Sequence, residues 1–289
     1  MSVPHITVIG SINLDLVARC PTLPAPGETV LGDEFSMSPG GKGGNQALAA
    51  RLLGADVDFI GCIGADDHAV AATKLLRDAG VNTDQCRAEK TLATGVALIA
   101  VSDDGENLIV VAPGANAALS AADVPARIST ALIGQLEIPV MALTAAIERC
   151  EGFKVLNLAP AQTVPDSLLS QADLLIVNET EAAFYGQEKL LGFNRRVALT
   201  LGAEGAVMYR EGREVARARP PKVGVVDTVG AGDAFVAAIT LAILEGRDDQ
   251  AALEFACAVG AIATTRHGAQ TGLPDRADVD RLINMGAER

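Results

Sequence analysis

The sequence predicts an α/β fold: a doubly wound, mostly parallel sheet flanked by helices, with a small β lid inserted. From residue 131 onward, strand-like and helix-like runs alternate, as they do in chains of βαβ units. A strand at 58–64 followed by a helix at 68–80 has the same rhythm. Two stretches, approximately 16–38 and 92–112, hold short β segments and turn residues but no helical pattern. We interpret them as the lid, within a single domain spanning 1–289.

Each element follows from a local pattern. The apolar run from Ile6 to Ile9 predicts a strand that ends at Gly10. Prolines and glycines divide residues 17–37 into hairpin-like segments, and helix formers at 45–53 predict a helix that Gly54 ends. A second hairpin is expected from 93–101 and 107–112. The remaining strands are expected at 131–136, 154–158, 173–177, 197–201 and 205–210, and helices at 139–150, 179–186, 233–245, 249–265 and 277–285.

Composition excludes several classes of protein. The 289 residues are 49% hydrophobic and 20% charged, which is typical of a globular chain. A net charge of −13 argues against a nucleic-acid partner, because such proteins need a basic surface. The five cysteines form no C-x-x-C pair, which predicts reduced thiols. Neither a signal peptide nor a membrane span is recognisable, so we expect a cytoplasmic protein.

The sharpest motif is the string DTVGAGDAF at 227–235, which ends a turn and opens a helix. The free N–H groups and the dipole of a helix start favour an anion, and Gly230, Ala231 and Gly232 let a phosphate approach closely. Asp233 would then lie beside the γ-phosphate, where a carboxylate can take a proton from an attacking hydroxyl. The alternative is an ordinary Asp at the start of an ordinary helix.

Two further motifs are typical of a polar-ligand site. The string PGGKGGNQA at 39–47 is no P-loop, but its glycines allow close approach and Asn45 offers a donor and an acceptor to sugar hydroxyls. Asn13 and Asp15 follow the first strand two positions apart, so in an extended segment they share a face. Taken alone, these motifs also fit a Gly-rich turn and a solvated polar pair.

Together these three motifs resemble the PfkB family of carbohydrate kinases, and most of all its ribokinase-like members. The resemblance continues in order through GANAALS (114–120), QLE (135–137), NETE (178–181), TLG (200–202) and RHGAQ (266–270). It implies a ribokinase-like fold and transfer of the γ-phosphate of MgATP to a primary hydroxyl of a small sugar, D-ribose being the expected acceptor.

The resemblance also implies residue roles. Asp233 would be the base, and Gly230, Ala231 and Gly232 the anion hole. The sugar site would contain Asn13, Asp15, Gly41, Lys42, Asn45 and Glu137. The nucleotide would be bordered by Asn178, Thr200, Gly202 and the helix around 258–261, with Glu181 holding Mg²⁺ through water. A K⁺ site would use Asp227 and the carbonyls of Val229, Thr264 and Gly268.

Two departures from the family pattern matter. Ten residues separate Gly186 from Val197, where a further helix is usual. Either the sheet lacks a covering helix there, or Glu181 to Leu191 form one shortened crossover helix. Gly272 stands where such chains often carry Ser, so K⁺ dependence is less firmly implied than Mg²⁺ dependence.

Two other functions stay open at this point. The acceptor is alternatively a nucleoside, a keto-sugar or a sugar alcohol, because pocket walls set specificity. A sensor that binds sugar without catalysis would share the fold. The lid sheet is also a natural homodimer surface, and a homodimer is expected.

Overall fold

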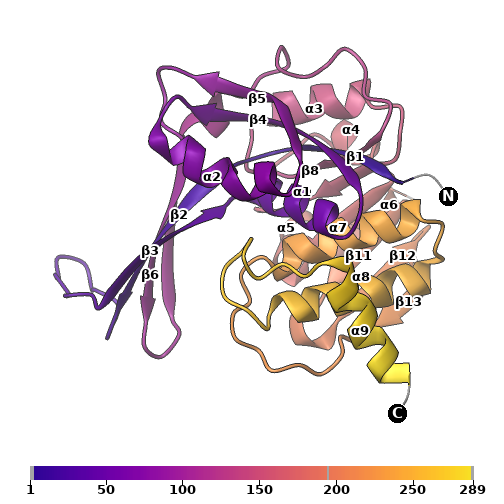
Figure 1. Cartoon of the computed structure of the whole chain (residues 1–289). Coiled ribbons are helices and arrows are strands. Elements are labelled where there is room, and N and C mark those ends of the chain that lie inside the picture. The colour runs from indigo at the N-terminus through magenta and orange to yellow at the C-terminus, as the bar shows by residue number, and fades with distance from the viewer. Residues whose placement is uncertain (1–2, 194, 288–289) are drawn as a thin grey trace.

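The centre of the molecule is a nine-stranded sheet, seen in a computed structural model that describes residues 3–193 and 195–287 (Figure 1). Across the sheet the strands run β13-β12-β11-β10-β9-β8-β1-β4-β5, and all neighbours from β11 to β5 are parallel. The two strands at the other edge are antiparallel. The bounds are β1 His5–Ile9, β4 Asp56–Gly64, β5 Asn82–Glu89, β8 Ala131–Gly134, β9 Lys154–Asn157, β10 Leu174–Asn178, β11 Arg196–Thr200, β12 Ala206–Arg210 and β13 Arg213–Ala218.

Helices cover both faces of this sheet, because its strands are apolar on both sides. Along β10, Leu174 and Ile176 enter one hydrophobic core, whereas Leu175 and Val177 enter the other. The first core is covered by α1 (Lys42–Leu52), α2 (Asp67–Asp78), α7 (Ala231–Leu244), α8 (Asp249–Ala263) and α9 (Arg276–Ala287). The second is covered by α3 (Val140–Arg149), α4 (Asp166–Leu169), α5 (Glu179–Tyr185) and α6 (Gln187–Gly192).

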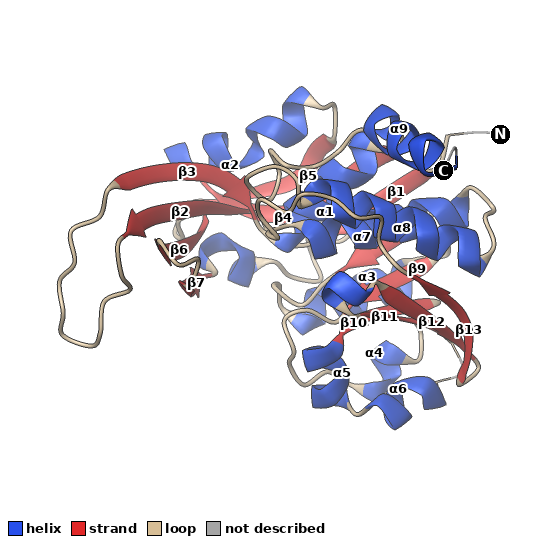
Figure 2. Ribbon diagram, turned by 90° about the horizontal axis from the view of Figure 1, so that it is seen from below, coloured by secondary structure: helices blue, strands red, loops and turns tan. Residues whose placement is uncertain are grey.

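A separate four-stranded sheet projects from one side of this body (Figure 2). Its order is β3-β2-β6-β7, from β2 (Asn13–Cys20), β3 (Glu34–Gly40), β6 (Gly95–Ser102) and β7 (Asn107–Ala112). Parallel pairing of β2 with β6 joins two antiparallel hairpins. We call this sheet the lid sheet. A 3₁₀ turn, η1 (Gly114–Ala118), follows it.

The lid sheet has two unlike faces. Asp15 lies in register with Ser38 and Ala97, so these side chains share one face. The opposite face carries large apolar side chains that are at least half exposed: Phe35, Met37, Leu98, Leu108 and Val110. An exposed apolar face on a small sheet indicates an interaction surface.

The predicted fold class is confirmed, and the expected strands and helices are present with ends shifted by a few residues. The prediction missed β5 and β13, both strands at the edges of the large sheet, and the short α4. No helix in the described ranges is long and apolar enough to span a membrane.

The short segment after Gly186 forms a complete crossover. A left-handed Gly186, with φ of 82°, separates α5 from α6, and β11 then pairs in parallel with β10. Leu190 of α6 is buried in the second core. Of the two alternatives, the crossover helix is therefore the correct one, although it is broken into two pieces. The sheet face does not lose its cover here.

Candidate active site

Asp233 lies in the first turn of α7 and is buried. The helix begins after Gly230, whose φ of 81° is in the left-handed region that favours glycine. A Cβ on Gly230 would lie 2.5 Å from the carbonyl oxygen of Ala269, so the adjoining loop also requires glycine here. By contrast, a Cβ on Gly232 would meet nothing within 4 Å. The start of α7 therefore faces an open space. Its Ala231 N–H donates to the Thr228 carbonyl at 3.3 Å, and the dipole of the helix start suits an anion.

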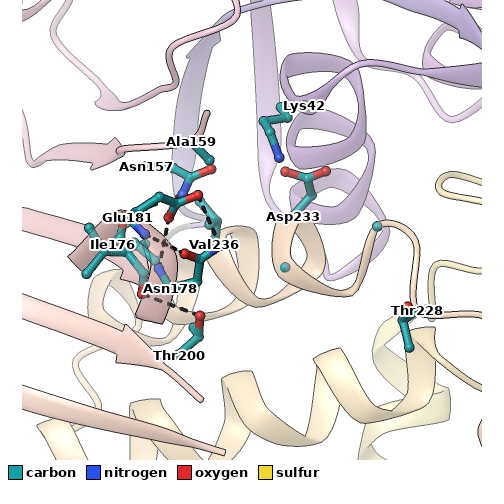
Figure 3. Close-up of a pocket in the computed structure, with 13 residues that line it drawn as sticks. Lys42, Asn157, Ala159, Ile176, Asn178, Glu181, Thr200, Thr228, Asp233 and Val236 are labelled. Carbon is teal, nitrogen blue, oxygen red and sulfur yellow. Dashed lines mark hydrogen bonds between the residues drawn. The ribbon is translucent and has the colours of Figure 1, made fainter. Parts of the chain in front are cut away.

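A cavity of about 240 Å³ lies in front of this helix start (Figure 3). Seven residues predicted from the sequence line it together: Lys42, Asn178, Glu181, Thr200, Gly230, Gly232 and Asp233. Six more were not predicted: Asn157, Ala159, Ile176, Val177, Thr228 and Val236. Because the carboxyl ends of β9, β10 and β11 meet the N-terminus of α7 here, the cavity occupies the usual ligand position of an open α/β sheet.

The Asp233 carboxylate is held by amides on α1. Asn45 donates its Nδ2 to Oδ2 and Gln46 donates its Nε2 to Oδ1, each at 2.9 Å. The side chain of Lys42 points toward the carboxylate in Figure 3. The charge of Asp233, and to a lesser extent the charges of Glu137 and Glu181, raise the pKa of Lys42 against the opposing effect of burial. The site therefore keeps a cation beside the carboxylate.

The predicted sugar residues meet at the edge between lid sheet and body. Burial, together with the charges of Glu137 and Asp233, raises the pKa of Asp15 to about 6. Asn116 of η1 holds Asn13 by donating its Nδ2 to the Oδ1 of Asn13 at 2.8 Å. Asn116 also accepts from the N–H of Ile12 and donates to the Ile12 carbonyl, both at 3.0 Å. Asn116 lies in the segment GANAALS, to which the sequence assigned no role.

Glu137 and Gly41 occupy the other side of that edge. Glu137 accepts hydrogen bonds from Ser11 Oγ at 2.5 Å and from the Lys42 N–H at 3.0 Å, so a carboxylate faces the N-terminus of α1. Gly41 has a φ of 85°, and a Cβ there would lie 2.8 Å from the N atom of Asn13. This contact brings the Gly-rich motif directly against the Asn13 strand.

Asn178 and Glu181 are tied to one another as a capping box at the start of α5. Glu181 N–H donates to Asn178 Oδ1, and Asn178 N–H donates to Glu181 Oε2, both at 2.8 Å. The pKa of Glu181 is raised, mainly by burial and also by the charge of Asp233, although Lys42 opposes the shift. Thr200 lies on the next strand and Gly202, with a φ of 54°, opens the turn beyond it.

The predicted cation positions lie on two adjoining segments, one before α7 and one after α8, and they are not equivalent. The Asp227 carboxylate accepts hydrogen bonds from the N–H groups of Val229 and Gly268, at 3.0 and 2.9 Å. The Thr264 carbonyl already accepts from Val226 and Asp227, at 2.7 and 3.1 Å. The carbonyl oxygens that do converge are those of Gly268, Arg266 and Ala263, which lie 2.8, 3.1 and 3.2 Å from the Cβ position of residue 272. The sequence missed Arg266 and Ala263, since a motif does not reveal carbonyl directions.

Sequence comparison gives a consistent picture. The model of the pfkB family of carbohydrate kinases matches residues 3–276. The chain is 38% identical to a ribokinase of Schizosaccharomyces pombe over 97% of its length and 98% of that protein. It is also 38% identical to a ribokinase of Haemophilus influenzae, over 94% and 96% of the two chains.

Solved structures agree with this family match. A crystal structure of ribokinase from Thermotoga maritima superposes with a TM-score of 0.89 at 32% identity, covering 97% of this chain and 99% of that one. Arabidopsis thaliana ribokinase complexed with ribose and ATP gives 0.84 at 28% identity, over 98% and 99%. Fold, site and sequence therefore agree, and the chain belongs to the PfkB family of carbohydrate kinases.

Proposed function

We propose that this protein transfers the γ-phosphate of MgATP to a primary hydroxyl of D-ribose, giving ribose 5-phosphate, with Asp233 as the base. The observation that carries the proposal is the Asp233 carboxylate, which lines the cavity directly at the open N-terminus of α7. Relatives at up to 38% identity are named ribokinases, and solved ribokinases hold ribose with ATP, or ADP.

The chemistry follows from that arrangement. Asp233 takes the proton of the sugar hydroxyl as its oxygen bonds to the γ-phosphorus, the bond from that phosphorus to the bridging oxygen breaks, and ADP leaves. The N–H groups at Gly230, Ala231 and Gly232 stabilise the charge that develops on the transferring group. Lys42 adds a positive charge to the same cavity.

The sugar is proposed to lie between the lid sheet and α1. Asp15 and Glu137 supply acceptors for its hydroxyls, and Asn13 and Asn45 supply amides. Gly41 lets the Gly-rich motif pack directly against the strand that carries Asn13. Support comes from contacts that join these groups to the base: Asn45 donates to Asp233, and Glu137 accepts from the N–H of Lys42.

ATP is proposed to extend from Asp233 toward the ends of β10 and β11. Thr200 and Gly202 would border the nucleotide, and Asn178 its phosphates. A Mg²⁺ ion that arrives with ATP is held largely by phosphate oxygens and water, so the Glu181 carboxylate, which lines the cavity, fits it through a water molecule. The ion would neutralise charge on the transferring phosphate.

A K⁺ ion is proposed beside the anion hole. Carbonyl and carboxylate oxygens are the ligands that hard cations prefer. The fit is supported by the carbonyls of Ala263, Arg266 and Gly268, which surround the bare Cα of Gly272. Because the Thr264 carbonyl accepts two N–H groups, we now favour these carbonyls over it, with Asp227 and Val229 retained.

We further propose that the lid sheet closes over the sugar and joins two copies of this single-domain chain. Closure would exclude water, which competes with the sugar as acceptor. The apolar face formed by Phe35, Met37, Leu98, Leu108 and Val110 supports the homodimer, since burying it removes an unfavourable exposed surface.

The test of substrate is ADP release from MgATP across a panel of sugars, sugar alcohols and nucleosides, with and without K⁺. We expect turnover with D-ribose and stimulation by K⁺. Turnover with another acceptor alone would overturn the ribose assignment and keep the mechanism. Sugar binding in a calorimeter without ADP release for any acceptor would instead indicate a sensor.

The test of mechanism is Asp233→Asn, which keeps the shape of the side chain and removes the base. We expect kcat to fall by about 10²–10⁴-fold, the usual contribution of general base catalysis. Ribose binding should persist, because Asn still offers an oxygen to the site. Turnover near that of the unmodified protein would refute the role of Asp233.

A further inference from the structure

A second amide in the Gly-rich motif has no role in the proposal above. Gln46 of α1 is completely buried and, among the described residues, is not part of the cavity lining. Its Nε2 donates to Asp233 Oδ1 at 2.9 Å and to Asn157 Oδ1 at 3.2 Å. It therefore contacts two residues that line the cavity, Asp233 and Asn157, without lining the cavity itself.

The carboxylate of Asp233 is held at both oxygens. Asn45 takes Oδ2 while Gln46 takes Oδ1, so two consecutive residues of α1 fix the plane of a carboxylate on α7. A carboxylate only accepts hydrogen bonds, so each amide must turn its NH₂ end toward it. One donor would still let the group rotate about its bond, whereas two donors fix its orientation.

Gln46 is in turn held by Asn157 at the carboxyl end of β9. Asn157 accepts from Gln46 and donates its Nδ2 to the Ile176 carbonyl of β10 at 3.4 Å. A continuous path of amides thus connects the central sheet to Asp233. The Asp233 carboxylate is therefore held in position by contacts that lead to β9 and β10, as well as by its own helix.

Stability alone does not explain this glutamine. Within the described part of the chain, its Oε1 is buried without a hydrogen-bond donor. An unpaired buried acceptor costs about 1–3 kcal/mol, which an apolar side chain of similar volume avoids. The Oε1 of Gln135 is likewise unpaired among the described residues, so what distinguishes Gln46 is that its paired Nε2 donates to the Asp233 carboxylate.

We propose that Gln46 is a positioning residue for Asp233 and that Asn157 acts through it. This inference rests on the proposed role of Asp233 as base. The pair of donors fixes both oxygens of a carboxylate that lines the cavity, where the proposed acceptor hydroxyl must approach. A misplacement of about 1 Å in such a group can cost as much as 10²-fold in rate.

The test compares Gln46→Met, Asn157→Leu and the double variant. Gln46→Met keeps the volume and removes the N–H groups; we expect kcat to fall by about 10–10²-fold while KM for ribose and ATP and the calorimetric ribose affinity stay within about twofold. If Asn157 acts through Gln46, the double variant should be no slower than Gln46→Met alone. Gln46→Leu serves as a second variant if the methionine packs poorly.

The control is Gln135→Met. Gln135 is equally buried and donates Nε2 to the Ile9 carbonyl at 3.0 Å, so this variant also loses a buried amide, but away from Asp233. It should keep kcat within about threefold. Normal kcat in both Gln46 variants, a rise in KM that matches the fall in kcat, or additive losses in the double variant would overturn the proposal.

These outcomes separate the two hypotheses. If Asp233→Asn is nearly inactive and Gln46→Met is normal, only the positioning role fails. If Asp233→Asn retains its turnover, the base assignment fails and the positioning role falls with it.

Discussion

The wall of the site formed by α1, α7 and β9 contrasts with the lid sheet. In the wall, polar side chains are buried and bonded to one another, as with Asn45, Gln46 and Asp233. In the lid sheet, apolar side chains are exposed: Val110 is 64% and Phe35 62% accessible. Both regions depart from the usual rule that polar side chains are exposed and apolar ones buried: the wall buries charged and polar groups at the cavity, and the lid sheet exposes the apolar face that we propose to be a dimer surface.

This difference separates the two jobs of the enzyme. The wall must hold reacting groups in place, so it is built on helices and strands of the main sheet. The proposed role of the lid sheet is to close over the sugar, and this sheet projects from one side of the body. Substitutions in the wall should therefore change kcat, whereas those in the lid should change KM and assembly.

The largest effect after Asp233→Asn is expected for Gly230→Ala. The new Cβ would lie 2.5 Å from the Ala269 carbonyl, and alanine is strained at a φ of 81°. We expect a loss of about 1–3 kcal/mol in the free energy of unfolding and a fall in kcat of about 10²-fold as the anion hole shifts. Steady-state kinetics and thermal melting measure both.

Gly246→Ala is the matched control for this change. Gly246 follows the other end of α7 with a φ of 82°, but a Cβ there meets nothing within 4 Å. It should lose stability and keep kcat. If the two variants had the same kcat, Gly230 would be needed only for its backbone conformation and not for the geometry of the anion hole.

A smaller effect on turnover is expected from Val110→Asp on the apolar face of the lid sheet. A charge there opposes burial against a second copy, so light scattering should give the mass of a monomer instead of a dimer. KM for the sugar should rise several-fold with kcat little changed. Val215→Asp alters a valine of β13 that is also exposed, and it should leave mass and KM unaltered. An unmodified protein that is already monomeric would contradict the dimer.

The last effect concerns the stability of the free protein and not its turnover, and it is expected from Asp15→Asn. The folded state raises the pKa of Asp15 from 3.8 to about 6, so folding binds its proton more tightly. The associated stability is present below pH 4 and is lost as pH rises through 6. Asn avoids this loss, at most about 3 kcal/mol for a shift of about two units.

Melting temperatures measured from pH 4 to pH 8 without ligand check this prediction. The variant and the unmodified protein should coincide near pH 4, and the variant should be the more stable above pH 7. Asp103→Asn, in an exposed turn of the lid sheet, should follow the unmodified protein throughout. A variant less stable than the unmodified protein at pH 8 would mean that the carboxylate is not destabilising.

The sequence predicts much of this molecule because its patterns are local. The apolar run of β10 and the helix formers after Asp233 need no tertiary information. The edge strands β5 and β13 were missed because their sequences, NTDQCRAE and REVARA, are polar enough to resemble loops. Polar residues on edges prevent unwanted pairing, and the same choice removes the strand signal.

Sequence motifs predict only those site residues that belong to the motifs themselves. The seven predicted residues that line the cavity each carry a motif signal. Asn157 lies in the predicted strand 154–158 and Asn116 in the segment GANAALS, but each contacts a residue more than 100 positions away, which a local motif does not reveal. The directions in which the Ala263 and Arg266 carbonyls point are set by the backbone, and the identity of the side chains does not predict them.

The hydrogen bond between Asn45 and Asp233 links residues 188 positions apart. A ribosome adding about 5–20 residues per second needs roughly ten to forty seconds to cover that span. Throughout this interval the nascent chain carries the proposed sugar motifs without the proposed base, and Asn45 and Gln46 lack the Asp233 carboxylate to which they donate. Catalytic competence is thus acquired late in synthesis, when α7 emerges and docks onto a helix that was made long before.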